Sequence, residues 1–217
     1  MKKRAIAVFD FDGTLTEKDT LIEFVKFACG VSAFVGGFLR YFPYVLLMKM
    51  NLYPNWKIKE KLFRFFFQGW FYSDFVRCCE EFSNRIKTFE RKSILSLLEK
   101  HVKKKDMVIV ITASIEEWVI PWCDSYNVNM VIGTKIEVDE DGVITGRFKT
   151  KNCYGIEKVK RLLEVEPDRN SYYLYAYGDS KGDMEILSFS DESKYVGYRK
   201  SNFFSKKHWE TVNKLKL

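Results

Sequence analysis

Short apolar runs bounded by turn-forming residues alternate along the chain with stretches of helical periodicity. Four runs are typical of strands buried on both faces, and they cover residues 5–9, 107–111, 128–133 and 172–177. Helical patterns lie between or after them, at residues 115–124, 155–165 and 183–189. Strands that alternate with helices usually form a parallel sheet with helices on both faces, so the pattern predicts an α/β fold.

Two segments break this alternation. Residues 135–148 alternate as a hairpin does, and Asp141-Gly142 supplies the positive-φ turn that hairpins favour. Residues 19–87 hold 18 of the chain's 36 aromatic residues in a helical pattern, which predicts a helical module inserted after the first strand. We therefore expect a core domain formed by residues 1–18 and 88–217, and a helical cap domain over residues 19–87.

Within the predicted cap, "FVGGFLRYFPYVLLM" at residues 34–48 approaches the composition of a membrane span. Arg40 and Pro43 interrupt it, and an arginine at the centre of a bilayer costs about 3 kcal/mol or more. A buried cap helix, or one that lies in a lipid interface, fits the segment better than a span does.

Composition narrows the class of protein. The formal net charge of +7 favours anionic partners, although lysines scattered for solubility explain it equally well. Five cysteines without a C-x-x-C pair indicate reduced thiols, and with no secretory signal visible the expected location is the cytoplasm. The aromatic residues gather in apolar helices and no RNA-binding signature is present, so nucleic acid is not the expected partner and a non-enzymatic nucleic-acid-binding protein is a distant alternative.

Polar side chains follow three of the predicted strands, at the edge where open α/β sheets bind ligands. They are Asp10 and Asp12 after the first strand, Thr112 and Ser114 after the second, and Asp179 and Asp183 after the last, with Lys158 near a helix start. Two neighbouring carboxylates repel each other, and Mg²⁺, which prefers oxygen ligands, removes that repulsion and cancels charge on a phosphate. Helix capping explains one of the later acids but not two acid pairs, and Lys151 competes with Lys158.

These residues resemble the four motifs of the haloacid dehalogenase (HAD) superfamily of phosphatases, in order. The matching stretches are "DFDGT" at residues 10–14, "ITAS" at 111–114, Lys158, and "GDSKGD" at 178–183. The resemblance implies a Rossmann-like three-layer parallel core and a Mg²⁺-dependent phosphomonoesterase that forms an aspartyl-phosphate. It makes Asp10 the nucleophile and Asp12 the general acid/base, and an acid there suits a phosphatase better than a dehalogenase. It assigns phosphate binding to Phe11, Gly13, Thr112, Ala113 and Lys158, and metal binding to Asp10, Asp12 through its carbonyl, Asp179 and Asp183.

The position of the inserted module resembles a type C1 cap, which suggests the phosphoserine-phosphatase-like subfamily IB. "CYGIEKVKRL" at residues 153–162, "GDSKGD" and the aromatic, basic cap resemble more closely the bacterial phosphatidylglycerophosphatases of the C type. That likeness implies a lipid phosphate as substrate and peripheral membrane contact through the cap, at the inner face of the membrane. The alternative is a small phosphorylated metabolite such as phosphoserine. Asp19 stands where the phosphoserine phosphatases carry a substrate-binding glutamate, and we expect it to cap a helix instead.

Overall fold

The structure is a computed structural model that describes residues 3–50 and 52–196. The basic tail after Arg199, which falls within the expected core domain, and His208 lie outside the described residues.

A parallel five-stranded sheet forms the core, in the order β3-β2-β1-β6-β7. Its strands are β1 (Arg4–Phe9), β2 (Met107–Ile115), β3 (Met130–Thr134), β6 (Tyr172–Gly178) and β7 (Glu192–Tyr195). The four apolar runs form parallel strands, as predicted, and the structure shows that they are adjacent in the sheet. The exposed, polar strand β7, "ESKY", was not predicted, because an edge strand needs no continuous apolar run.

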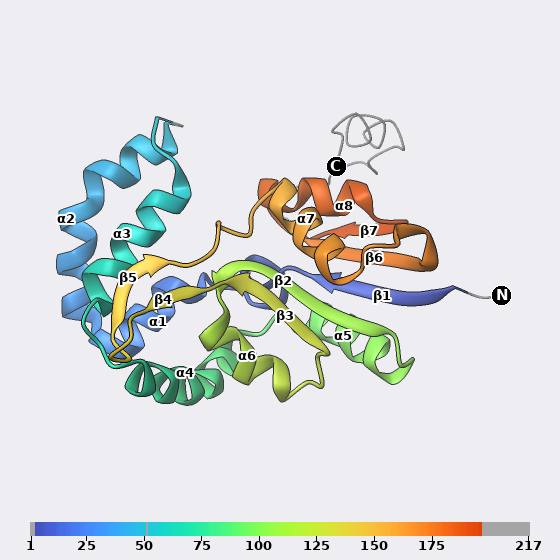
Figure 1. The fold of residues 1–217 in the computed structure, drawn as a ribbon, viewed down its shortest axis with the longest axis horizontal. Coiled ribbons are helices and arrows are strands. Elements are labelled where there is room, and N and C mark those ends of the chain that lie inside the picture. Colours follow the sequence, from blue (N-terminus) through green and yellow to red (C-terminus); the bar gives the residue numbers. More distant parts are fainter. Residues whose placement is uncertain (1–2, 51, 197–217) are drawn as a thin grey trace.

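Helices cover both faces of this sheet (Figure 1). Alternate residues of β1 point to opposite faces: Ala7 and Phe9 pack with α5 (Lys92–Lys103) and α6 (Glu116–Asp124), whereas Ile6 and Val8 pack with α7 (Ile156–Val165) and α8 (Met184–Phe189). The predicted α/β fold with three layers is confirmed. Helix α5 was missed; its N-cap residue, Arg91, offers no side chain that caps the free N–H groups of the first turn.

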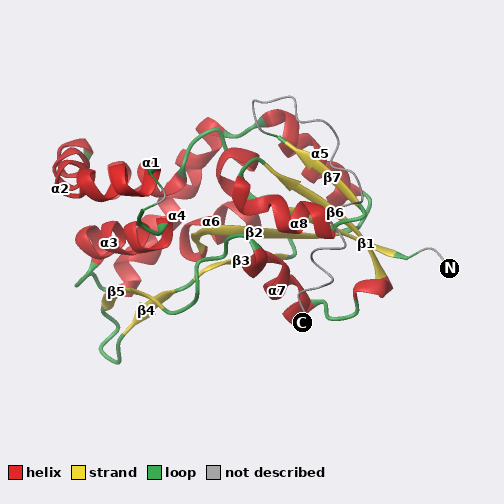
Figure 2. Ribbon diagram, turned by 90° about the horizontal axis from the view of Figure 1, so that it is seen from above, coloured by secondary structure: helices red, strands yellow, loops and turns green. Residues whose placement is uncertain are grey.

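The aromatic insertion folds into four helices that lie beside the core, beyond the carboxyl ends of β1 and β2 (Figures 1 and 2). They are α1 (Thr20–Cys29), α2 (Val31–Lys49), α3 (Asn55–Phe67) and α4 (Tyr72–Ile86). The ring of Phe24 in α1 contacts four aromatic side chains, which are Phe67, Phe75, Phe82 and Trp118. Because Trp118 belongs to α6, this cluster joins the helical insertion to the core.

The two chain segments that connect the core with these helices run side by side. Thr16 and Glu90 form an antiparallel bridge, Glu17 N donates to Phe89 O at 2.8 Å, and Arg91 N donates to Leu15 O at 2.7 Å. Backbone hydrogen bonds therefore join the two segments where they pass between the sheet and the helical insertion. The division into core and cap at residues 18 and 88 stays a prediction.

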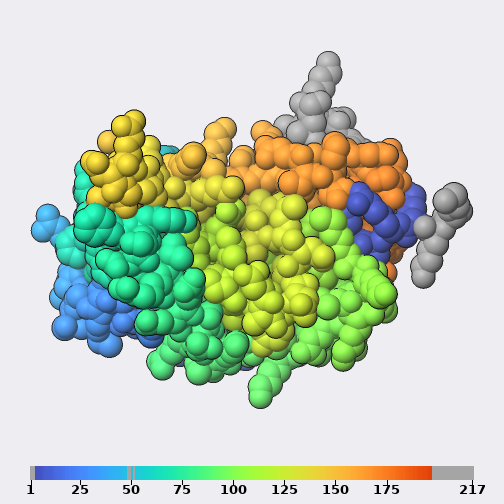
Figure 3. All heavy atoms as spheres, turned by 60° about the horizontal axis from the view of Figure 1, so that its bottom comes forward, coloured from blue at the N-terminus to red at the C-terminus, as the bar shows by residue number. Residues whose placement is uncertain are grey.

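The predicted hairpin is present as β4 (Ile136–Val138) and β5 (Ile144–Phe148), and it packs on α3 and not on the sheet. Figure 3 shows its surface against that of the helical insertion. Backbone hydrogen bonds connect it to the turn after α3, from Gly69 N to Ile144 O and from Ile144 N to Trp70 O, both at 2.9 Å. The hairpin, which lies far from the helical insertion in the sequence, therefore extends the surface of that insertion.

Helix α2 continues through Pro43, and it is not the buried helix that composition allowed. Five apolar side chains along it are each 46 to 66% exposed, namely Val31, Val35, Leu39, Phe42 and Leu46. They recur at intervals of three or four residues and therefore form one stripe, called here the α2 stripe. Among the described residues, no helix has the length and apolar character needed to cross a membrane.

Candidate active site

The carboxyl ends of three neighbouring strands bring the predicted polar residues to one edge of the sheet. Phe9 of β1 pairs with Val110 of β2 and with Tyr177 of β6, so the chain segments that follow these positions lie side by side. Asp10 N donates to Tyr177 O at 2.9 Å, which holds the first acid next to the loop after β6. The register of these strands therefore determines which residues lie together at the site.

Three carboxylates form a cluster at this edge. Asp10, Asp179 and Asp183 each offer one oxygen, and these oxygens lie within 4.8 Å of one another. Asp10 and Asp183 are buried, and Asp179 is partly buried. Buried, closely spaced carboxylate oxygens suit a hard divalent cation such as Mg²⁺, because the cation supplies the opposite charge that they lack. The donor set therefore fits the metal that the motifs imply.

Gly13 allows the first loop to pass against this cluster. Its φ is +83°, and a Cβ at this position would lie 2.7 Å from the Asp179 Cγ. Next to it, Thr14 Oγ1 donates to Asp179 Oδ1 at 2.9 Å. Both the positive φ and the close approach explain why glycine occupies this position.

Lys158 is the cation that contacts the cluster. It lies in the first turn of α7, and its Nζ is 2.5 Å from Asp10 Oδ1 and 2.5 Å from Asp183 Oδ1. Lys151 is exposed, and its backbone carbonyl accepts a hydrogen bond from Arg161 Nη2 at 2.6 Å. Of the two candidate lysines, the structure places Lys158 at the acidic cluster.

Burial and charge perturb the titration of this pair. Burial raises the pKa of Asp10 to about 8, although Lys158 acts to lower it. Burial alone would lower the pKa of Lys158, but the carboxylates of Asp10 and Asp183 raise it above its usual value. The lysine therefore stays charged between the two carboxylates.

The Asp12 side chain does not belong to this group of three carboxylates, and its hydrogen-bond partners lie in α1 and β2. Its carboxylate accepts hydrogen bonds from Thr20 N, at 2.9 Å, and from Ser114 Oγ. Burial, followed by the charge of Asp19, raises its pKa to about 6, against the opposing effects of Ser114, of Lys59 in α3 and of Thr20. The Asp12 side chain is thus separate from the other three acids, and its assignment to the metal through the carbonyl stays a prediction.

The remaining predicted phosphate ligands lie just after β1 and within the last residues of β2. Thr112 is buried, and its Oγ1 accepts from Ser114 N at 3.0 Å. Ala113 O accepts from Thr134 Oγ1 at 3.1 Å. The Phe11 ring is buried 5.1 Å from the Trp122 ring, so only its backbone is available to a ligand.

A family model described as haloacid dehalogenase-like hydrolase matches residues 7–188. The chain belongs to the haloacid dehalogenase-like hydrolases. Among curated proteins, this hydrolase is 31% identical over 203 residues to protein CicA of Caulobacter vibrioides. The matched region spans 89% of this chain and 86% of CicA. It is also 30% identical over 101 residues to a histidinol-phosphatase of Neisseria meningitidis serogroup C, across 44% of this chain and 46% of that protein.

Solved structures share the fold of this hydrolase. A protein of unknown function from Bordetella pertussis Tohama I superposes with a TM-score of 0.75 at 18% identity, covering 88% of this chain and 89% of that one. A substrate-bound phosphoserine phosphatase superposes with a TM-score of 0.63 at 14% identity, covering 89% and 86%. These likenesses include the helical insertion as well as the sheet, because they extend over most of each chain.

The structure gives contacts to three hydroxyl side chains to which the motifs assigned no role, and of these the sequence had singled out only Ser114 as a polar residue at this edge. Thr14 contacts Asp179, and Ser114 contacts Asp12, so two hydroxyls within the motif stretches orient the acids. Ser180 N and Oγ donate to Asp183 Oδ2 at 2.9 and 2.7 Å. Ser180 and Asp183 therefore form a capping box, and Asp183 also contacts Lys158. Helix capping, the alternative role considered for the later acids, thus applies to Asp183.

Proposed function

We propose that the chain is a Mg²⁺-dependent phosphomonoester hydrolase that uses Asp10 as its nucleophile. The observation that carries the proposal is the buried cluster of Asp10, Asp179 and Asp183 with Lys158 against it, at the carboxyl edge of a parallel sheet. Membership of the hydrolase family supports it, as do the names of two similar proteins, a histidinol-phosphatase and a phosphoserine phosphatase.

Asp10, Asp179 and Asp183, with the Asp12 carbonyl, are the groups that would hold Mg²⁺. When bound, the metal would neutralise charge on the phosphoryl oxygens, so that an anionic nucleophile can approach. Lys158 lies against Asp10 and would bind the same oxygens through its ammonium group, while Thr112 and the amides near Phe11 and Gly13 donate hydrogen bonds.

The reaction then needs one nucleophile and one acid. Asp10 attacks phosphorus with a carboxylate oxygen, and the bond from phosphorus to the leaving alcohol breaks as Asp12 gives its proton to that oxygen. The pKa of about 6 keeps Asp12 protonated more often near neutral pH than an ordinary carboxyl group. Ionised Asp12 next takes a proton from water, whose oxygen attacks the aspartyl-phosphate and releases inorganic phosphate and Asp10.

The direct test compares Asp10→Asn with Asp141→Asn, a control in the exposed hairpin turn. Asp10→Asn is expected to abolish Mg²⁺-dependent phosphate release and the incorporation of labelled phosphate into acid-quenched protein, with an unchanged circular dichroism spectrum. Asp141→Asn and the parent protein should both lose activity in EDTA and regain it with Mg²⁺. Substantial activity in Asp10→Asn, or equal activity in EDTA, would refute the assignment.

The α2 stripe favours a lipid phosphate, such as phosphatidylglycerophosphate, as the substrate. An exposed apolar stripe on a helix costs free energy in water and is stabilised where the helix lies in a lipid interface. Residues 30–68 also carry six basic residues and a single acid, Glu60, which suits an anionic membrane surface. We propose that the cap contacts the membrane through this stripe and presents lipid headgroups to Asp10.

A small phosphomonoester such as phosphoserine is the alternative. Leu39→Gln/Phe42→Gln is compared with Ile120→Gln, an exposed apolar residue of α6 in the core. With lipid phosphate in mixed micelles, kcat/KM should fall at least about 10-fold in the stripe variant only, while turnover of p-nitrophenyl phosphate stays the same. Equal or better turnover of phosphoserine by the parent protein, without liposome binding, would favour the alternative.

A further inference from the structure

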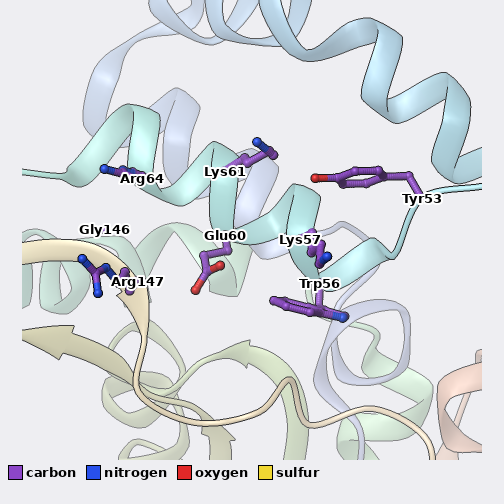
Figure 4. A pocket seen from close by; sticks show the side chains of 8 residues that line it. All are labelled: Tyr53, Trp56, Lys57, Glu60, Lys61, Arg64, Gly146 and Arg147. Atoms are coloured by element: carbon purple, nitrogen blue, oxygen red, sulfur yellow. The ribbon is translucent and has the colours of Figure 1, made fainter.

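A cavity of about 350 Å³ lies between α3 of the cap and the β5 edge of the hairpin. Four cationic side chains line it, which are Lys57, Lys61, Arg64 and Arg147. In Figure 4 the rings of Tyr53 and Trp56 stand at one end of the cavity and the two arginines at the other. The cavity shares no lining residue with the acidic cluster of the active site.

The positive charge in this cavity has little internal compensation. Within residues 3–50 and 52–196, Lys57, Lys61 and Arg64 have no carboxylate within 4.0 Å, and the pair from Arg147 Nε to Glu137 Oε2, at 4.0 Å, joins two exposed side chains. Glu60 is the one acid in the lining, and its Oε1 already accepts from Phe148 N at 3.0 Å. A surface lined by four cations and one acid favours an anionic ligand.

Close packing shapes the cavity before any ligand binds. Gly146 has a φ of +81°, and a Cβ there would lie 2.7 Å from the Arg64 Cγ, so the hairpin backbone rests directly against α3. Lys61 Nζ lies over the Tyr44 ring, 5.2 Å from its centroid, and Arg64 Nε donates to Gln68 Oε1 at 3.1 Å.

We propose that this cavity binds a phosphate group, carried either by a small phosphorylated anion or by the headgroup of an anionic lipid. Arginine forks match phosphate oxygens with paired hydrogen bonds, and lysine ammonium groups add point charges. The aromatic end offers a flat, amphipathic surface to the organic part of the ligand. The site is distinct from the catalytic one, and it places a second phosphate contact on the joint surface of cap and hairpin.

The experiment uses the Asp10→Asn protein in EDTA, so that neither turnover nor a metal contributes. Calorimetric titration with inorganic pyrophosphate measures binding of a free phosphate compound, and flotation with phosphatidylcholine vesicles containing phosphatidic acid measures binding of a lipid phosphate. Lys61→Gln/Arg64→Gln is compared with Lys92→Gln/Lys100→Gln, which removes two exposed cations from α5 in the core. Fluorescence of Trp56, identified by its loss in Trp56→Phe, reports occupancy of the cavity itself.

Binding of either probe should weaken at least about 10-fold in the cavity variant and stay within about twofold in the control. Binding of pyrophosphate identifies a small anion as the source of the phosphate, and binding of vesicles alone identifies a lipid. Failure of both probes to bind the parent, or equal binding by the cavity and control variants, would overturn the proposal. Because no turnover is measured, these outcomes are independent of whether Asp10 is the nucleophile.

Discussion

Replacement of Lys158 by methionine should reveal how strongly one cation holds the acidic cluster together. Lys158 is 2% exposed, and it lies 2.5 Å from oxygens of both Asp10 and Asp183, of which the latter is fully buried. Methionine keeps most of the side-chain volume but leaves two carboxylates without their cation. Because removal of one partner from a buried ion pair costs about 3–5 kcal/mol, Lys158→Met should lower the free energy of unfolding by that amount at pH 8 in EDTA.

The loss should depend on pH. The pKa of Asp10 in the folded protein, about 8, lies above its ordinary value of 3.8, so the folded state binds the proton more tightly and stability falls as the pH rises between these values. Lys158 opposes this shift, so its removal raises the pKa of Asp10 further and prolongs the fall to higher pH. The difference between the parent and Lys158→Met should therefore be smaller at pH 5, where Asp10 is protonated in both.

Urea denaturation, followed by circular dichroism in EDTA at pH 5 and pH 8, measures both quantities. Lys160→Met, an exposed lysine two residues along the same helix, serves as the control and should change stability by less than about 0.5 kcal/mol. Addition of Mg²⁺ should stabilise Lys158→Met more than the parent protein, because the ion supplies the missing charge. A loss below about 1 kcal/mol at pH 8, or an equal loss at both pH values, would refute this account.

Three further predictions concern the loop, the cap and its core. Gly13→Ala should reduce Mg²⁺-dependent activity at least about 10-fold, because the added Cβ would crowd the Asp179 carboxylate. Gly142 has a similar φ and no atom near its Cβ position, so Gly142→Ala should leave activity unchanged and lower stability by only about 1–2 kcal/mol. Asp19→Ala should lower stability by about 1 kcal/mol, since Asp19 accepts from the α1 backbone at 3.2 Å; Asp19→Asn should lose less, and a large rise in KM for phosphoserine alone would contradict a capping role. Phe24→Ala should lower the free energy of unfolding by about 3–5 kcal/mol, and Phe42→Ala, at an exposed position, by less than about 0.5 kcal/mol. A small loss for Phe24→Ala would show that the helical insertion does not unfold together with the core.

The parallel strands, the helical insertion after the first strand and the edge that holds the site follow from the sequence, because each depends on local pattern. The order of the strands in the sheet was decided only by the tertiary structure. Apolar runs between turn residues fix which segments become buried strands, and a polar residue directly after such a run lies at the carboxyl edge. That is why Asp10 and Asp179 could be placed together. The role of Asp19 as a helix cap also follows, because capping needs only neighbouring residues.

Tertiary packing alone decided the rest. The motif resemblance favoured Lys158 and left Lys151 as a competitor, and only the packing of α7 against the sheet brings Lys158 to the cluster. The hairpin was recognisable from its turn, but nothing local indicated that it packs on α3 and builds a basic cavity there. The exposed α2 stripe has the composition of a buried helix, because apolar residues on a helix do not reveal whether protein, lipid or water will cover them.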